Sequence, residues 1–248
     1  MYHYFYDSYL VEKKYHSDMA KAETRLMDLG INGKVSRLSF LKNIDQVIKE
    51  EMQQGTKTFV IVGNDNTFGQ LINYLADLEV TIGFIPIGEA NNNISKLLGI
   101  PSGENACDIL SARIIDGLDL GKVNNNYFLT TLKLSGNGAG LNCDGDYYLS
   151  FEGKNDFITI SNLAAKNELP SPTNNGLFTI EIKSVEKKFL FGEKANYSYL
   201  TSKHIFVTEE HKPISITITD ENKITKTPAE IIMLPKKLKV IVGKNRLY

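Results

Sequence analysis

Residues 58–67 read TFVIVGNDNT, and this stretch decides the fold class. It opens with an unbroken apolar and β-branched run, which is typical of a parallel strand covered on both faces. Gly63 and Asn64 then supply turn residues, and the apolar spacing over 68–75 predicts a helix that begins near Thr67. A buried strand, a tight turn and a helix together predict one unit of a parallel α/β sheet.

The same alternation extends outward from this stretch in both directions. Strands are predicted at residues 2–6, 34–40 and 80–85, and helices at residues 15–29, 44–52, 94–98 and 104–115. Strands joined by helices of this length need crossover connections, which make the sheet parallel. Residues 1–120 are therefore predicted to form a doubly wound α/β domain.

After residue 116 the pattern changes to short strands separated by turns. They are predicted at 127–134, 147–151, 157–160, 178–182, 204–207, 214–218, 231–233 and 238–242. This pattern predicts an antiparallel β-sandwich over residues 121–248. Turn residues place the boundary within 116–126, and the glycine-rich run at 136–140 is read as a turn or bulge because no helix follows it.

Composition narrows the class of protein. Hydrophobic residues make up 42% and charged residues 23% of the 248, as in ordinary globular proteins. The apolar runs are far shorter than the ~20 residues of a membrane span, and the first residues do not resemble a secretory signal, so a cytoplasmic location is expected. The spacing of the histidines and the two cysteines predicts neither a zinc site nor a disulfide framework. No alternation of basic and aromatic residues suggests a nucleic-acid partner.

The loop at residues 63–67 is the first candidate site. A strand, a turn and a helix N-terminus aim backbone N–H groups at one spot, which favours an anion such as phosphate. Gly63, Asn64, Asn66 and Thr67 would then contact the phosphate groups of a ligand, and Asp65 could bind a magnesium ion carried by those phosphates. In the alternative interpretation the two asparagines only form the turn, and Asp65 caps the helix.

A second loop of the same kind follows the next predicted strand. Residues 85–93 read IPIGEANNN, so Gly88, Glu89 and Asn91 lie between a buried strand and a helix. Open α/β sheets bind ligands in the crevice at the carboxyl ends of neighbouring strands. Both loops are therefore expected to line one crevice.

These motifs resemble a known family. GNDNT at 63–67, PIGEANNN at 86–93, LGIP at 98–101, NNG at 174–176 and LPKKLKV at 234–240 are similar in type and order to the motifs of diacylglycerol kinases and sphingosine kinases, including bacterial lipid kinases. The resemblance implies ATP as phosphoryl donor, Mg²⁺ and a cleft between two domains. It further implies a lipid or long-chain alcohol hydroxyl as acceptor, with transient contact to a membrane surface. An exposed sandwich edge could also pair with a second copy of the chain.

By position, the resemblance puts Asp65 at the nucleotide and metal, Gly88 and Asn91 at the nucleotide pocket, and Asp220 with Glu221 at the acceptor hydroxyl. If the spacing to the closing motif is kept, Asn222 takes the place of the general base instead. Several acidic or glycine positions of the family carry asparagine here, and Glu89 replaces a threonine. Two hypotheses follow: a divergent lipid kinase, or a kinase-fold binding or scaffolding protein that has lost catalysis.

Overall fold

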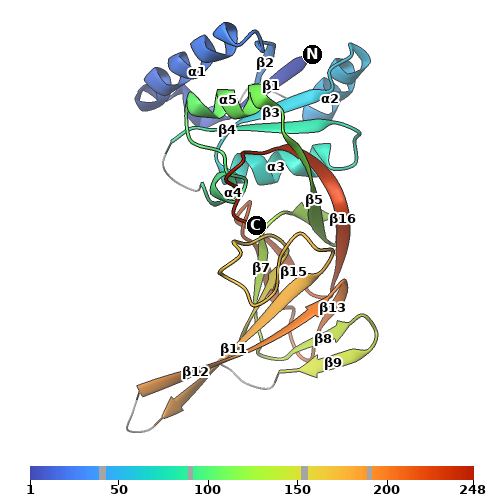
Figure 1. Cartoon of the computed structure of the whole chain (residues 1–248). Coiled ribbons are helices and arrows are strands. Elements are labelled where there is room, and N and C mark those ends of the chain that lie inside the picture. Colours follow the sequence, from blue (N-terminus) through green and yellow to red (C-terminus); the bar gives the residue numbers. More distant parts are fainter. Residues whose placement is uncertain (39–42, 89–91, 152–155, 189–191) are drawn as a thin grey trace. The chain divides into compact units, whose positions relative to one another are not determined.

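The computed structural model describes the chain except for residues 39–42, 89–91, 152–155 and 189–191, and the side chains of 186–193 also lie outside the description. The chain divides into two compact units (Figure 1). The first contains Met1–Leu118 and Lys237–Leu247, and the second contains Asp119–Lys236. Within the described ranges, no helix has the length and apolar character needed to cross a membrane.

The first unit has the parallel sheet that the sequence predicts. Its strands are β1 (Tyr2–Tyr6), β2 (Lys34–Arg37), β3 (Thr58–Gly63) and β4 (Thr81–Pro86). Its helices are α1 (His16–Asp28), α2 (Ile44–Gln53), α3 (Asp65–Leu75), α4 (Asn93–Leu97) and α5 (Asn105–Ala112). The strands pair in parallel in the order β2-β1-β3-β4. Every residue of β3 and β4 is buried, which accounts for their unbroken apolar runs.

Two details of the first unit differ from the prediction. Helix α5 ends at Ala112, short of the predicted residue 115, because Arg113 takes a left-handed conformation with φ of 54°. Two short 3₁₀ helices, Ser8–Val11 and Lys13–Tyr15, connect β1 to α1. They are too short to leave a periodic signal in the sequence.

The second unit is built from antiparallel strands. They are β6 (Asn126–Phe128), β7 (Thr131–Ser135), β8 (Ala139–Cys143), β9 (Tyr147–Ser150), β10 (Asp156–Ser161), β11 (Phe178–Lys188), β12 (Gly192–Ser202), β13 (His204–Glu209), β14 (Ser215–Ile218) and β15 (Lys223–Lys226). One sheet has the order β12-β11-β10-β7-β14-β15, and β13, β8 and β9 pair in another. Ile158 and Ile180 of the first sheet share one core with Leu141 and Val207 of the second, so the predicted sandwich is confirmed.

Strands β5 (Ile115–Val123) and β16 (Ala229–Ile241) each have residues in both units. The predicted boundary region is thus largely a strand, and the two strands predicted at 231–233 and 238–242 are one. Strand β16 pairs with β13 near its start and lies parallel to β4 near its end. Pro235 and Lys236, the latter with φ of 51°, interrupt its apolar alternation, which explains why the sequence suggests two strands.

Candidate functional site

Three strand ends meet at one edge of the parallel sheet. Asp7, just after β1, donates its N–H to the carbonyl of Val62 at 3.0 Å, and Ile87, just after β4, donates to the carbonyl of Gly63 at 2.9 Å. The two predicted loops therefore lie side by side, as expected for neighbouring parallel strands. Asp7 joins them, although sequence reasoning did not single it out as a site residue.

The first loop forms the start of helix α3. The Oδ1 atom of Asn64 accepts from the N–H of Thr67 at 3.2 Å, and Thr67 Oγ1 accepts from the N–H of Asn64 at 3.1 Å, which makes a capping box. A Cβ on Gly63 would lie 2.4 Å from Thr67 Oγ1, so this turn requires glycine. Asn66, two residues after Asn64, is half-buried. Asn64, and not Asp65, is therefore the N-cap of α3, and the helix begins at Asp65 rather than near Thr67.

The carboxylate of Asp7 lies at the same helix start. Its Oδ2 atom accepts from the hydroxyl of Thr67 at 2.5 Å, and its Oδ1 atom accepts from the N–H of Tyr9 at 3.2 Å. A negative charge is stabilised near a helix N-terminus, by about 0.3–1 kcal/mol at exposed sites. An incoming phosphate would meet this carboxylate at the start of α3, which weakens the site for a highly charged anion.

Asp65 is turned into the protein. It is 6% exposed, and its Oδ2 atom accepts from the backbone N–H groups of Asn93 at 2.6 Å and Ile94 at 3.1 Å. These donors are the first residues of α4, so Asp65 ties the start of α3 to the start of α4. The first loop is thereby joined to the second through one carboxylate.

The residues at this edge do not fit a magnesium ion held directly by Asp65. The Oδ1 atom of Asp65 is buried along with the rest of the side chain. No group of three or more His, Cys, Asp or Glu that could hold a metal occurs in the described part of the chain. Mg²⁺ prefers oxygen ligands, including several water molecules, in near-ideal octahedral geometry. A carboxylate committed to two backbone donors does not provide that.

In the second loop, one buried polar atom has no partner among the residues that the structure describes. Gly88 has φ of 91°, and Asn92 donates from Nδ2 to its carbonyl at 2.6 Å. Asn92 is 8% exposed, and within the described residues its buried Oδ1 atom has no hydrogen-bond partner. Glu89 and Asn91, both predicted to bind the nucleotide, lie outside the described residues. A buried acceptor of this kind fits a ligand that carries hydroxyl or amino donors, as a nucleoside does.

Asp220 and Glu221 lie in the second unit, in the turn between β14 and β15. Asp220 is 3% exposed and accepts from the N–H groups of Leu129 at 2.5 Å and Thr130 at 2.9 Å, and from the hydroxyl of Thr130. Burial raises the pKa of Asp220 above its usual value, against the effect of these hydrogen bonds. Glu221 is half-buried, and Asn222 is exposed with φ of 51°. Asp220 thus positions the segment between β6 and β7.

A second buried carboxylate, Asp119 on β5, was missed by the sequence analysis. It is fully buried and accepts from the N–H groups of Gly176 at 2.5 Å and Lys236 at 2.9 Å. Its own N–H donates to Asn174 Oδ1 at 2.8 Å, and the Lys236 ammonium lies 3.9 Å from the carboxylate. The lysine balances the buried charge, and the amide at 174 accepts a backbone bond that a carboxylate could also accept. No motif surrounds residue 119 in the sequence.

The comparisons with known proteins agree with this architecture. Residues 5–123 match the family model described as diacylglycerol kinase catalytic domain. No curated protein matches the chain. A crystal structure of a diacylglycerol kinase from Bacillus anthracis str. Sterne superposes with a TM-score of 0.76 at 17% identity, covering 99% of this chain and 97% of that one.

Two further structures from the same organism, described provisionally as diacylglycerol kinases, are equally similar. They give TM-scores of 0.77 and 0.78 at 17% identity, cover 99% of this chain, and are themselves covered to 98% and 96%. At this identity they establish the fold of the whole chain. Residues 5–123, slightly under half of the chain, are similar to the diacylglycerol kinase catalytic domain.

Proposed function

We propose that this protein binds a nucleotide at the edge formed by the ends of β1, β3 and β4, and that magnesium-dependent phosphoryl transfer is impaired in it. The observation that carries this proposal is the commitment of the Asp65 carboxylate to the N–H groups of Asn93 and Ile94. Phosphoryl transfer requires that the negative charge of the transferred phosphoryl group be neutralised, usually by metal ions held on carboxylates. Asp65 acts here as a structural anchor.

Other features of this edge support nucleotide binding itself. The buried Oδ1 atom of Asn92 can accept from a ribose hydroxyl or a base amino group, and the positive φ of Gly88 gives the loop beside it a conformation that side-chain-bearing residues rarely adopt. The half-buried amide of Asn66 can serve a polar ligand at the start of α3. The carboxylate of Asp7 favours ligands with little negative charge there, so we expect ADP or AMP to compete well with ATP.

The second candidate is an active lipid kinase, and the similarity of residues 5–123 to the diacylglycerol kinase catalytic domain favours it. In that case ATP and Mg²⁺ supply the phosphoryl group to a lipid or long-chain alcohol hydroxyl. Glu221, half-buried in the β14–β15 turn, would accept the hydroxyl proton, and Asp220 would position that turn. Asn222 has no useful basicity for this step.

One experiment separates the two candidates. ATP, ADP and AMP are titrated calorimetrically into the wild-type protein and into the Asp65→Asn variant, and ATP turnover is followed with a mixture of diacylglycerol, sphingosine and dodecanol as acceptors. The proposal predicts that nucleotides bind saturably to the wild-type protein, and that its ATP turnover does not exceed that of Asp65→Asn. Asp45→Asn is the matched control, because Asp45 also lies in a first helical turn but is exposed. Acceptor-dependent turnover that only Asp65→Asn removes would support the active kinase, and absence of all binding would refute the proposed site.

Contact with a membrane surface is proposed for the face of the sheet of β10, β11 and β12 that carries Phe157, Lys183 and Tyr197. Phe157, Lys183 and Tyr197 are paired across these strands, and Phe157 and Tyr197 are 54% and 51% exposed. Aromatic and lysine side chains are favoured together at membrane–water interfaces. Phe157→Ser is expected to reduce co-sedimentation with phosphatidylglycerol vesicles, and unchanged co-sedimentation would exclude this face.

A further inference from the structure

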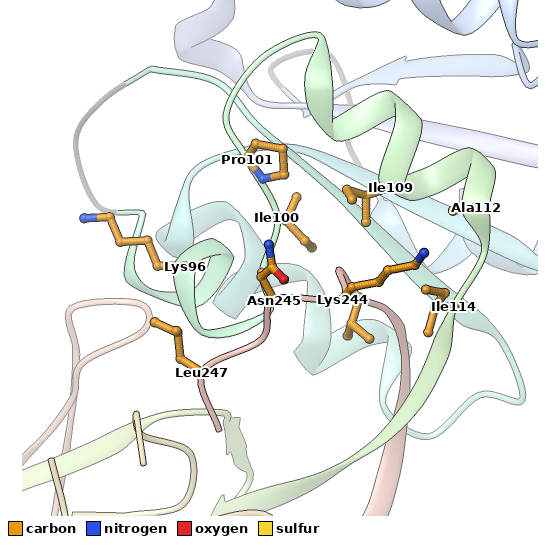
Figure 2. Close-up of a pocket in the computed structure, with 11 residues that line it drawn as sticks. Lys96, Ile100, Pro101, Ile109, Ala112, Ile114, Lys244, Asn245 and Leu247 are labelled. Atoms are coloured by element: carbon orange, nitrogen blue, oxygen red, sulfur yellow. The ribbon is translucent and has the colours of Figure 1, made fainter. Parts of the chain in front are cut away.

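The first unit contains an apolar cavity that no described residue of either candidate loop lines. Its volume is about 580 Å³, and its walls come from the end of α4 and the turn after it, from α5, and from the segment that follows β16 (Figure 2). Ile100, Ile109, Ile114 and Val242 give it an apolar surface. Small-molecule sites typically measure about 300–1,000 Å³ and are mostly apolar with a few polar groups. The size and lining of this cavity therefore match a ligand site.

The backbone holds one wall of the cavity in place. Gly243 donates its N–H to the carbonyl of Leu98 at 2.8 Å, and Leu247 donates to the carbonyl of Leu97 at 2.9 Å. A Cβ on Gly243 would lie 1.9 Å from the carbonyl oxygen of Gly99, so the two backbone segments touch directly. The C-terminal segment is thus fixed against the end of α4, and the cavity exists before any ligand arrives.

The polar side chains that line the cavity are those of Lys96, Lys244 and Asn245, and the two lysines are cationic. Lys96 and Lys244 lie on different sides of Ile100 (Figure 2), and both are exposed. Among the described residues neither lysine has an ion-pair partner, and the cavity lining contains no Asp or Glu. An apolar wall with two unpaired ammonium groups complements a molecule that has an apolar chain and an anionic end.

We propose that this cavity binds a single-chain anionic amphiphile, with its chain against Ile100 and Ile109 and its charged end at Lys244 or Lys96. A fatty-acid carboxylate and an alkyl phosphate share the required chemistry. The proposal does not depend on nucleotide binding, because neither Gly88 nor any of residues 63–67 lines the cavity. Its test accordingly needs no nucleotide.

The test is a calorimetric titration of the wild-type protein with decanoate, decyl phosphate and decanol, each below the concentration at which it aggregates. We expect saturable binding of one anion per chain, and binding of decanol at least about fivefold weaker. The comparison of decanoate with decyl phosphate identifies the headgroup. Lys96→Ala and Lys244→Ala should weaken anion binding by about two- to fivefold and leave decanol unchanged, since exposed charge pairs contribute modestly.

Filling the cavity with a large side chain tests whether the anion binds there. Ala112 is an exposed residue in the last turn of α5 that lines the cavity, and Ser111 beside it is exposed and does not. Ala112→Trp should weaken anion binding more than tenfold, while Ser111→Trp should change it less than twofold. The chain has no tryptophan, so a blue-shifted emission of Ala112→Trp reports directly that the indole has entered the cavity. Absence of saturable anion binding, equal affinity for decanol, or full binding by a blue-shifted Ala112→Trp would each overturn the proposal.

Discussion

Replacing Asp65 tests whether its carboxylate is an anchor between α3 and α4. In Asp65→Ala the N–H groups of Asn93 and Ile94 lose their acceptor, in a place where the carboxylate is 6% exposed. A buried donor left unsatisfied costs about 1–3 kcal/mol, and loss of a helix cap costs about 0.5–2 kcal/mol. The two terms overlap, so we expect the free energy of unfolding to fall by about 2–4 kcal/mol. Asp65→Asn keeps one acceptor oxygen and should lose about 1 kcal/mol.

Urea unfolding followed by circular dichroism measures this difference. Asp45→Ala is the control, because it removes an exposed carboxylate from the first turn of α2 and should cost less than about 1 kcal/mol. Hydrogen exchange adds a local readout, since the amides of Asn93 and Ile94 should lose protection before those of β3. A change below 0.5 kcal/mol in Asp65→Ala, with protection of both amides kept, would refute the anchor.

Three further predictions follow from buried groups and close backbone contacts. Burial holds the pKa of His3 below its ordinary 6.5, so the unfolded chain binds this proton more tightly and stability falls as pH drops through about 6.5. In urea unfolding at pH 7.5 and 5.5, His3→Gln should reduce this pH dependence of stability, and the exposed His211→Gln should not. The same pH dependence in the wild type and in His3→Gln would contradict the burial argument. Burial also raises the pKa of the Cys107 thiol to about 11 and raises that of Cys143, so neither should react with a disulfide reagent at pH 8 until the chain is unfolded. Rapid labelling of the native protein would show that these thiols are accessible. Gly243→Ala would place a Cβ 1.9 Å from a backbone carbonyl and should lower the melting temperature by several degrees, whereas an unchanged melting temperature would mean that the contact relaxes freely.

Much of the first unit could be predicted because its signals are local. The buried strand at 58–62, the glycine turn and the apolar period of the next helix each follow from a few consecutive residues. The strands of the second unit were harder to predict. Strand β12 has few apolar residues because it lies at the edge of its sheet, and β16 was divided by Pro235 although it continues past it. Such features depend on partners that are distant in the sequence.

The candidate site could be located from the sequence, but its contacts could not. The two loops were predicted to meet, and they do. The direction of the Asp65 carboxylate depends on the N–H groups of α4, and the part played by Asp7 depends on the hydroxyl of Thr67, 60 residues away. Asp119 shows the same limit, because its partners Asn174, Gly176 and Lys236 come from separate segments. A motif specifies residue types, and the fold decides which way each side chain faces.

The most direct test of the account is the magnesium dependence of nucleotide affinity. ADP is titrated into the wild-type protein with 5 mM Mg²⁺ (about the usual assay level) and with EDTA, because a nucleotide held through a protein-bound metal loses affinity when the metal is removed. We predict dissociation constants that agree within about twofold, since Asp65 is committed to the backbone of α4. A loss of more than tenfold in EDTA that Asp65→Asn reproduces in magnesium would contradict the central claim and identify Asp65 as part of a metal site.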